Sequence, residues 1–118
     1  MTLPEGIEAL EAGLRGTSLR SKAIANNIAN IDTPNYRRKD VQFEQLLADA
    51  METPGEGDLN EVEPLIVEPH ATPLDSHGND VNLDAEVGAM VKNGAAAKTY
   101  LRVMSKLYKQ METAIGGI

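Results

Sequence analysis

The sequence AIANNIANIDTPNYRRKDVQF, residues 23–43, decides how this chain is organised. It predicts the end of an amphipathic helix, a proline turn and then an extended basic segment. Because the residue before a proline is pushed out of the α region, we expect the helix to stop by about Asp32. Pro34 and Asn35 suit the centre of a β-turn, since proline fixes its own φ and asparagine tolerates the left-handed conformation. The stretch therefore predicts a long helix that ends at a fixed corner.

Upstream of this corner, apolar and small residues recur in alternating steps of three and four. They are Ile7, Leu10, Leu14, Thr17, Ser21, Ile24, Ile28 and Ile31. This heptad seam is typical of a coiled coil and predicts an N-terminal helix within residues 1–32, with Thr2 as its N-cap. Gly13 and Gly16 weaken such a helix, so it needs a partner to be stable in water.

A second seam fills the last part of the chain, residues 81–118. Its members are Leu83, Val87, Met90, Gly94, Ala97, Leu101, Met104, Tyr108, Met111 and Ile115. Asn82 or Asp80 could cap this helix, and Gly94 makes it thin enough for a partner's backbone to approach closely. We expect the two terminal helices to pack as an antiparallel or staggered pair. Because such a pair covers only one stripe per helix, packing between molecules is favoured over a self-sufficient hairpin.

Two different segments join these helices. Residues 33–50 contain the turn and then one short helix, predicted from the spacing of Phe43, Leu46, Leu47 and Ala50. Residues 51–80 are acidic and rich in proline and glycine, with Pro54 at their start, so we expect an irregular connector. Residues 65–67 resemble a strand but are too short to make a sheet alone. The fold class is therefore mainly α: two long terminal heptad helices packing as a coiled coil, a proline turn, a short helix and an irregular acidic connector.

Charge is distributed unevenly along the chain. Residues 41–86 carry twelve acidic side chains and no basic one, whereas residues 87–118 carry five basic side chains and one acidic one. The acidic middle could face the cationic end of a neighbouring copy, or it could be a solvated loop. The second alternative is favoured, because surface charge pairs contribute little individually.

Signals for catalysis or ligand binding are weak. The chain has no cysteine, and its two histidines lack a third ligand nearby, so neither a metal site nor a cofactor is expected. In residues 75–80, His77 stands at the third position of a calcium loop and Asp80 replaces the glycine required at the sixth, so a tight turn is predicted instead. No carboxylate is expected to be buried, and Arg37, Arg38 and Lys39 predict a partner-facing or solvated turn. We expect no enzyme activity, no small-molecule substrate, no nucleic-acid binding, no membrane insertion and no cleaved signal peptide.

The corner also carries a recognisable signature. The chain matches the pattern that closes the first helix of the bacterial flagellar rod family at Asn27, Ile28, Ala29, Asn30, Thr33, Pro34 and Tyr36. Asn35 stands where that family usually has glycine, a mild departure because asparagine also adopts the left-handed conformation. Residues 37–43 are most similar to the proximal rod subunits, and residues 78–86 resemble the family again. The chain is therefore identified as resembling the flagellar basal-body rod family over its two ends.

This resemblance implies a structural subunit of the proximal rod that self-assembles through its terminal helices. Its expected partners are other rod subunits and the membrane ring and export-gate proteins, which it would link to the drive shaft. The resemblance also implies a place in the periplasm-spanning rod of the flagellum, reached through type III export without a cleaved signal. The alternative is a small cytoplasmic helical adaptor or export chaperone, which would form a stable dimer; an enzyme is a third and less favoured class.

The seams and the signature together predict an assembly interface. Its expected residues are Leu14, Ile24, Asn27, Ile28, Asn30, Ile31, Pro34, Tyr36, Phe43, Met90, Ala97, Leu101, Met104, Tyr108 and Met111. The asparagines near the end of the first helix have two interpretations. They either cap a fraying turn or form interhelical hydrogen bonds that fix the register, and the resemblance favours the second.

Overall fold

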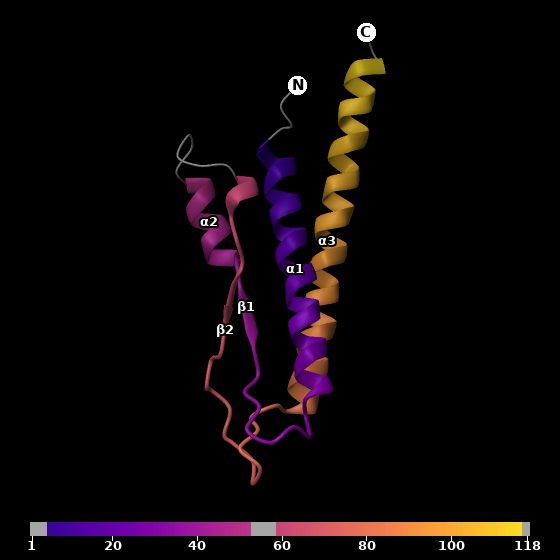
Figure 1. Cartoon of the computed structure of the whole chain (residues 1–118). Helices are drawn as coiled ribbons and strands as arrows, with labels where there is room; N and C mark the ends of the chain where they lie inside the picture. The colour runs from indigo at the N-terminus through magenta and orange to yellow at the C-terminus, as the bar shows by residue number, and fades with distance from the viewer. Residues whose placement is uncertain (1–4, 53–58, 117–118) are drawn as a thin grey trace.

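The computed structural model describes residues 5–52 and 59–116. In chain order these form helix α1 (Glu5–Ala29), strand β1 (Asp40–Gln42), helix α2 (Glu44–Glu52), the 3-10 turn η1 (Leu59–Glu61), strand β2 (Leu65–Val67) and helix α3 (Leu83–Gly116). The molecule is elongated, measuring 66 × 28 × 16 Å. Figure 1 shows α1 and α3 side by side, with α2 and both strands on the other side of α1. The prediction of a mainly helical chain with long terminal helices is confirmed; the cap expected at Thr2 and the break expected at Pro54 lie outside the described residues.

Helix α1 ends at Ala29, three residues before the expected stop at Asp32. The Asn30 side chain donates to the carbonyl of Asn26 at 2.8 Å and accepts from Thr33 Oγ1 at 3.1 Å. These bonds give the backbone an alternative to further helix, as asparagine commonly does. Asn35 has a φ of 61°, and the Thr33 carbonyl accepts a 3.3 Å hydrogen bond from the Tyr36 amide.

Helix α1 is covered on two sides, which the single predicted seam did not anticipate. One cluster joins Ala9 and Ala12 to Leu47 of α2 and Leu59 of η1. A second cluster joins Ala23 to Val41 and Phe43, with Leu19 packed against it. The small side chains on this face of α1 let the second layer approach closely.

Two glycines that were expected only to weaken α1 also admit aromatic rings. A methyl group at Gly13 would lie 2.8 Å from the ring of Tyr100 on α3, and one at Gly16 would overlap the ring of Phe43. At either position the added methyl group would be closer to the ring than carbon atoms can approach without displacement. Each ring therefore fills the space that a side chain would need. The glycines therefore contribute to packing on both sides of α1.

Strands β1 and β2 pair as an antiparallel sheet, with Asp40 opposite Val67, Val41 opposite Ile66 and Gln42 opposite Leu65. Residues 65–67, which resemble a strand too short to make a sheet alone, form β2 within the expected irregular connector and pair with β1. The segment that leaves the corner supplies the partner strand, and this long-range pairing leaves no local signal in the sequence.

Helix α3 faces α1 with a stripe that lies one residue before the predicted one. Its contacts with α1 come from Glu86, Asn93, Tyr100 and Leu107, which reach Asn27, Thr17, Gly13 and Gly6. One residue corresponds to a rotation of about 100° around the helix. As a result, Val87, Leu101 and Tyr108 of the predicted seam are exposed. Close approach at Gly94 is also not found within the chain, since a methyl group there would meet nothing within 4 Å.

Candidate assembly site

A group of polar side chains, which we call the corner cluster, joins α1, the corner and α3. Its members Asn27, Asp80 and Glu86 are buried, and Tyr36 and Arg38 are half-buried. Asn27 is 0% exposed, and its Oδ1 accepts from the Lys39 amide at 2.9 Å and the Tyr36 hydroxyl at 3.1 Å. Its Nδ2 donates to the Lys39 carbonyl at 2.8 Å and to Glu86 Oε2 at 3.2 Å. Since an amide side chain has two donor hydrogens and two acceptor lone pairs, all its bonding capacity is used.

Two carboxylates of the corner cluster are buried, which corrects the expectation that none would be. Glu86 is 1% exposed and accepts from Arg38 Nε at 2.6 Å. Asp80 Oδ1 accepts from the Arg38 amide at 2.5 Å, and its Oδ2 lies 3.5 Å from Arg37 Nη1. The expectation that Arg37 and Arg38 form a partner-facing or solvated turn is therefore wrong, because both cations pair with α3 or the segment before it.

The same contacts shift two pKa values at the corner. The hydrogen bond to Glu86 raises the pKa of Arg38. Burial, followed by the nearby charges of Glu86 and Asp80, raises the pKa of Tyr36, the hydroxyl group of which donates to Asn27. Removing one member of this network takes a hydrogen bond from a buried side chain such as Asn27 or Glu86, and that is costly.

The segment before α3 folds back onto the corner. Asn79 Nδ2 donates to the carbonyls of Asn30 and Thr33, both at 2.9 Å, and the Asn35 amide donates to the His77 carbonyl at 2.9 Å. Gly78 has a φ of 75°, and a methyl group there would lie 2.6 Å from Asn35 Oδ1, so glycine is needed for both reasons.

Two side chains of the segment before α3 accept hydrogen bonds from nearby backbone amides. Asp75 Oδ1 accepts from the amides of His77 and Asn79, which lowers the pKa of its carboxyl group. Asn82 Oδ1 accepts from the Ala85 amide at 3.0 Å and caps α3, as one of the two predicted caps. The two parts of the sequence that carried the family resemblance, around residues 27–36 and 78–86, thus lie against each other.

A second group of polar contacts, centred on Arg20, holds β1 and α2 to α1. The sequence did not predict it. Arg20 forms two hydrogen bonds to Glu44, at 2.5 and 2.8 Å, and a third to the Val41 carbonyl at 2.6 Å. Its guanidinium carbon lies 4.7 Å from the centre of the Phe43 ring. The hydrogen bond from Arg20 lowers the pKa of Glu44. Bidentate pairing and ring stacking together fix the start of α2.

An apolar stripe runs along the side of α3 that α1 does not cover. We call it the outer stripe; its exposed large members are Leu83, Val87, Met90, Leu101, Tyr108 and Ile115. One hollow of about 500 Å³ lies at Leu101, Met104 and Tyr108, and another of about 470 Å³ is lined by Gly94 together with Ser18 and Ser21 of α1. Exposed apolar side chains aligned along one helix mark an interaction site more often than singly scattered ones do.

The structure divides the predicted interface residues into three groups. Buried are Ile24, Asn27 and Phe43. Half-buried are Leu14, Ile28, Asn30, Ile31, Tyr36, Ala97, Met104 and Met111. Exposed are Pro34, Met90, Leu101 and Tyr108. Contacts within the chain are made by Asn27, Tyr36 and Phe43. The exposed Met90, Leu101 and Tyr108 belong to the outer stripe.

Two kinds of feature are absent among the described residues, a metal-binding group and a helix that could span a membrane. Among them, no group of three or more histidine, aspartate or glutamate side chains could hold a metal ion. No helix in this part of the chain combines the length and apolar character needed to cross a bilayer. The arrangement provides hydrogen bonding that fixes two helices and an apolar surface beside them.

These features define a structural protein built on two long terminal helices joined at a polar corner. A family model described as "Flagella basal body rod protein" matches residues 7–37. Over 116 residues the chain is 31% identical to the flagellar basal body rod protein FlgB of Borreliella burgdorferi, covering 83% of this chain and 86% of the relative. It is 31% identical over 120 residues to FlgB of Bacillus subtilis, covering 94% and 93%, and 27% identical over 116 residues to FlgB of Borrelia hermsii, covering 83% and 86%.

The chain belongs to the flagellar basal-body rod family, and within that family it resembles FlgB. This is a family of structural proteins of the flagellar basal body. The resemblance noted at the corner is thereby confirmed.

Proposed function

We propose that this chain is a subunit of the proximal rod and that it self-assembles through its terminal helices. The observation that carries the proposal is the outer stripe, whose Leu101 side chain is 54% exposed in a single copy. Burying such a side chain against a neighbour is favourable, at about 25 cal/mol per Å² of apolar surface. The seven-residue spacing of Leu101 and Tyr108 suits coiled-coil packing between subunits.

In this proposal the corner cluster positions the stripe without itself meeting a neighbour. The Asn27–Glu86 and Thr17–Asn93 hydrogen bonds fix how α3 is rotated on α1. That rotation leaves Leu101 and Tyr108 facing outward. The partners would be other rod subunits together with the membrane ring and export gate, which the rod would link to the drive shaft. The route to this site would be type III export without a cleaved signal peptide.

The proposal is tested by replacing Leu101 with glutamate in cells that lack the native copy. Glutamate is a good helix former and the site is exposed, so the free energy of unfolding of the isolated chain is expected to change by no more than about 0.5 kcal/mol. Flagella are expected to be lost, because a charge would be buried between subunits without a partner. Counting flagella per cell by electron microscopy measures the effect.

Thr99→Glu is the matched control, because Thr99 is also exposed on α3 but lies about 200° around the helix from Leu101. It is expected to leave flagella unchanged. Normal flagella with Leu101→Glu would contradict the proposal. A stable dimer of the isolated wild-type chain at micromolar concentration would instead favour an adaptor or chaperone.

A further inference from the structure

We propose that the outer stripe and basic edge of α3 in one copy dock on the acidic layer formed by α2, η1 and β2 of the next copy. This inference rests on the proposed function and names the neighbour and the surface that α3 meets. The contact is head to tail, so each copy uses one surface to bind the copy before it and a different surface to bind the copy after it.

Helix α3 presents a basic surface beside the outer stripe. Its five cations, Lys92, Lys98, Arg102, Lys106 and Lys109, are all exposed. Steps of four and seven residues place Lys98, Arg102 and Lys109 along one edge of the helix, next to Leu101. Within residues 87–116, Glu112 is the only acidic side chain. A partner for this face therefore needs apolar groups and negative charge together.

The layer on the other side of α1 has that combination. Its exposed carboxylates include Glu52 of α2, Glu61 of η1, and Glu63 and Glu68 on either side of β2. The same layer exposes the apolar side chains Leu46, Met51, Leu65 and Ile66. No lysine or arginine occurs between residues 41 and 86. Its charge and exposed apolar groups are thus complementary to those of α3.

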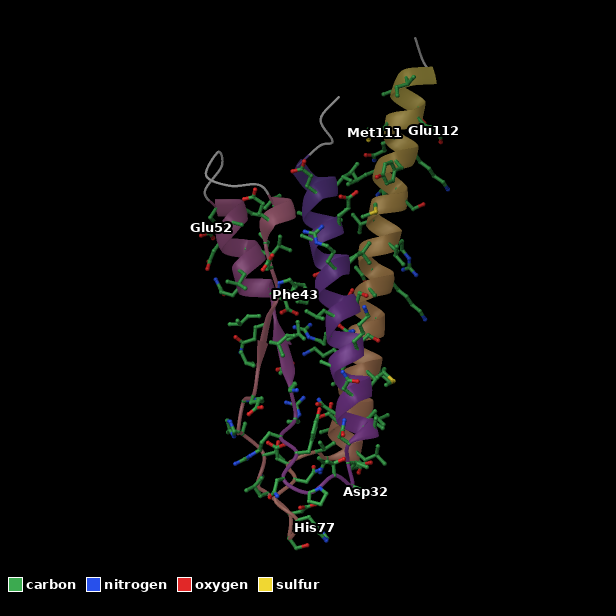
Figure 2. The ribbon with its side chains drawn as sticks, viewed as in Figure 1. Asp32, Phe43, Glu52, His77, Met111 and Glu112 are labelled. Atoms are coloured by element: carbon green, nitrogen blue, oxygen red, sulfur yellow. The ribbon has the colours of Figure 1, made fainter. Side chains whose placement is uncertain are left out.

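The two surfaces cannot meet within one molecule, because α1 lies between them. Figure 2 shows Glu52 on α2 and Glu112 on α3 at opposite sides of α1. A second copy is required, and the contact joins two different faces. Such heterologous contacts form rings or open helical polymers, and the open form is what a rod needs. Symmetric pairing of two α3 helices through the outer stripe would instead bring Lys98, Arg102 and Lys109 of one copy close to those of another.

Charge reversal tests this arrangement in cells that lack the native copy. One variant reverses the basic edge (Lys98→Glu, Arg102→Glu and Lys109→Glu), and a second reverses the acidic layer (Glu61→Lys, Glu63→Lys and Glu68→Lys). Each alone is expected to reduce flagella per cell about tenfold or more, since like charges would meet at every subunit contact. All six changes in one chain are expected to restore flagella, as is co-expression of the two variants, because every contact can then pair opposite charges.

Restoration by the combined chain also shows that the reversed surfaces fold and are exported. If wild type restores flagella and either reversed variant does so equally well, the docking inference is overturned while the rod function stands. If both variants fail and neither combination restores, α3 meets a partner other than a second copy, which also overturns the inference. Failure of wild type to restore flagella would overturn the proposed function itself.

Discussion

Replacing Asn27 with alanine is expected to lower the free energy of unfolding by about 3 kcal/mol. The side chain is fully buried and makes four hydrogen bonds, to Tyr36, Glu86 and both backbone groups of Lys39. Alanine would remove all four bonds at once and leave Oε2 of the buried Glu86 without the amide that donates to it, and an unsatisfied buried polar group is costly. Urea denaturation followed by circular dichroism measures the change.

Asn26→Ala provides a control one residue away. Asn26 has an exposed side chain in the same turn of α1, and alanine has the higher helix propensity, so stability is expected to stay equal or rise slightly. Equal effects at positions 26 and 27 would contradict the role given to the corner cluster. They would mean that Asn27 matters only through helix propensity.

The second large effect is expected at Gly16. Helix propensity alone predicts that Gly16→Ala stabilises the chain by about 1 kcal/mol. The structure predicts the opposite sign, with a loss of about 2 kcal/mol, because the added methyl group would overlap the ring of Phe43. Thermal or urea unfolding decides between the two signs.

Gly94→Ala is the matched control for this sign test. A methyl group at Gly94 meets nothing within 4 Å, so the propensity gain of about 1 kcal/mol is expected in the isolated chain. A double-mutant cycle with Phe43→Ala adds a second test, since Gly16→Ala is then expected to be neutral or stabilising. A Gly16→Ala chain as stable as Gly94→Ala would rule out the packing of Phe43 on α1.

The sequence predicted the two helices and their pairing because the heptad pattern is local and long. It missed the rotation of α3 by one residue because an apolar pattern identifies the side most favourable to bury, not the side that α1 covers. The covered side of α3 is selected by three contacts with α1. These are the hydrogen bonds Thr17–Asn93 and Asn27–Glu86 and the packing of the Tyr100 ring at Gly13. Two of these three contacts are polar, so counting apolar residues cannot find them. The apolar stripe that was predicted remains on α3 and faces outward.

The candidate site was predicted in part. The asparagines were expected to be either capping or interhelical, and both occur: Asn30 closes the turn, while Asn27 reaches Glu86 on α3. The docking of residues 75–80 on the corner had no local signal, since it joins segments more than forty residues apart. Burial of Asp80 and Glu86 was missed for the same reason, because their cationic partners lie across that distance.

We expect the outer stripe of α3 to be buried against a neighbouring subunit in the rod. The chain contains no cysteine, so Leu101→Cys and Thr99→Cys each introduce one thiol for labelling. The most direct measurement compares maleimide labelling of each variant in the purified chain and in isolated basal bodies. We expect the thiol at position 101 to react readily in the purified chain and to be protected in basal bodies, while the thiol at position 99 reacts in both. Equal labelling at position 101 in the two samples would contradict the claim.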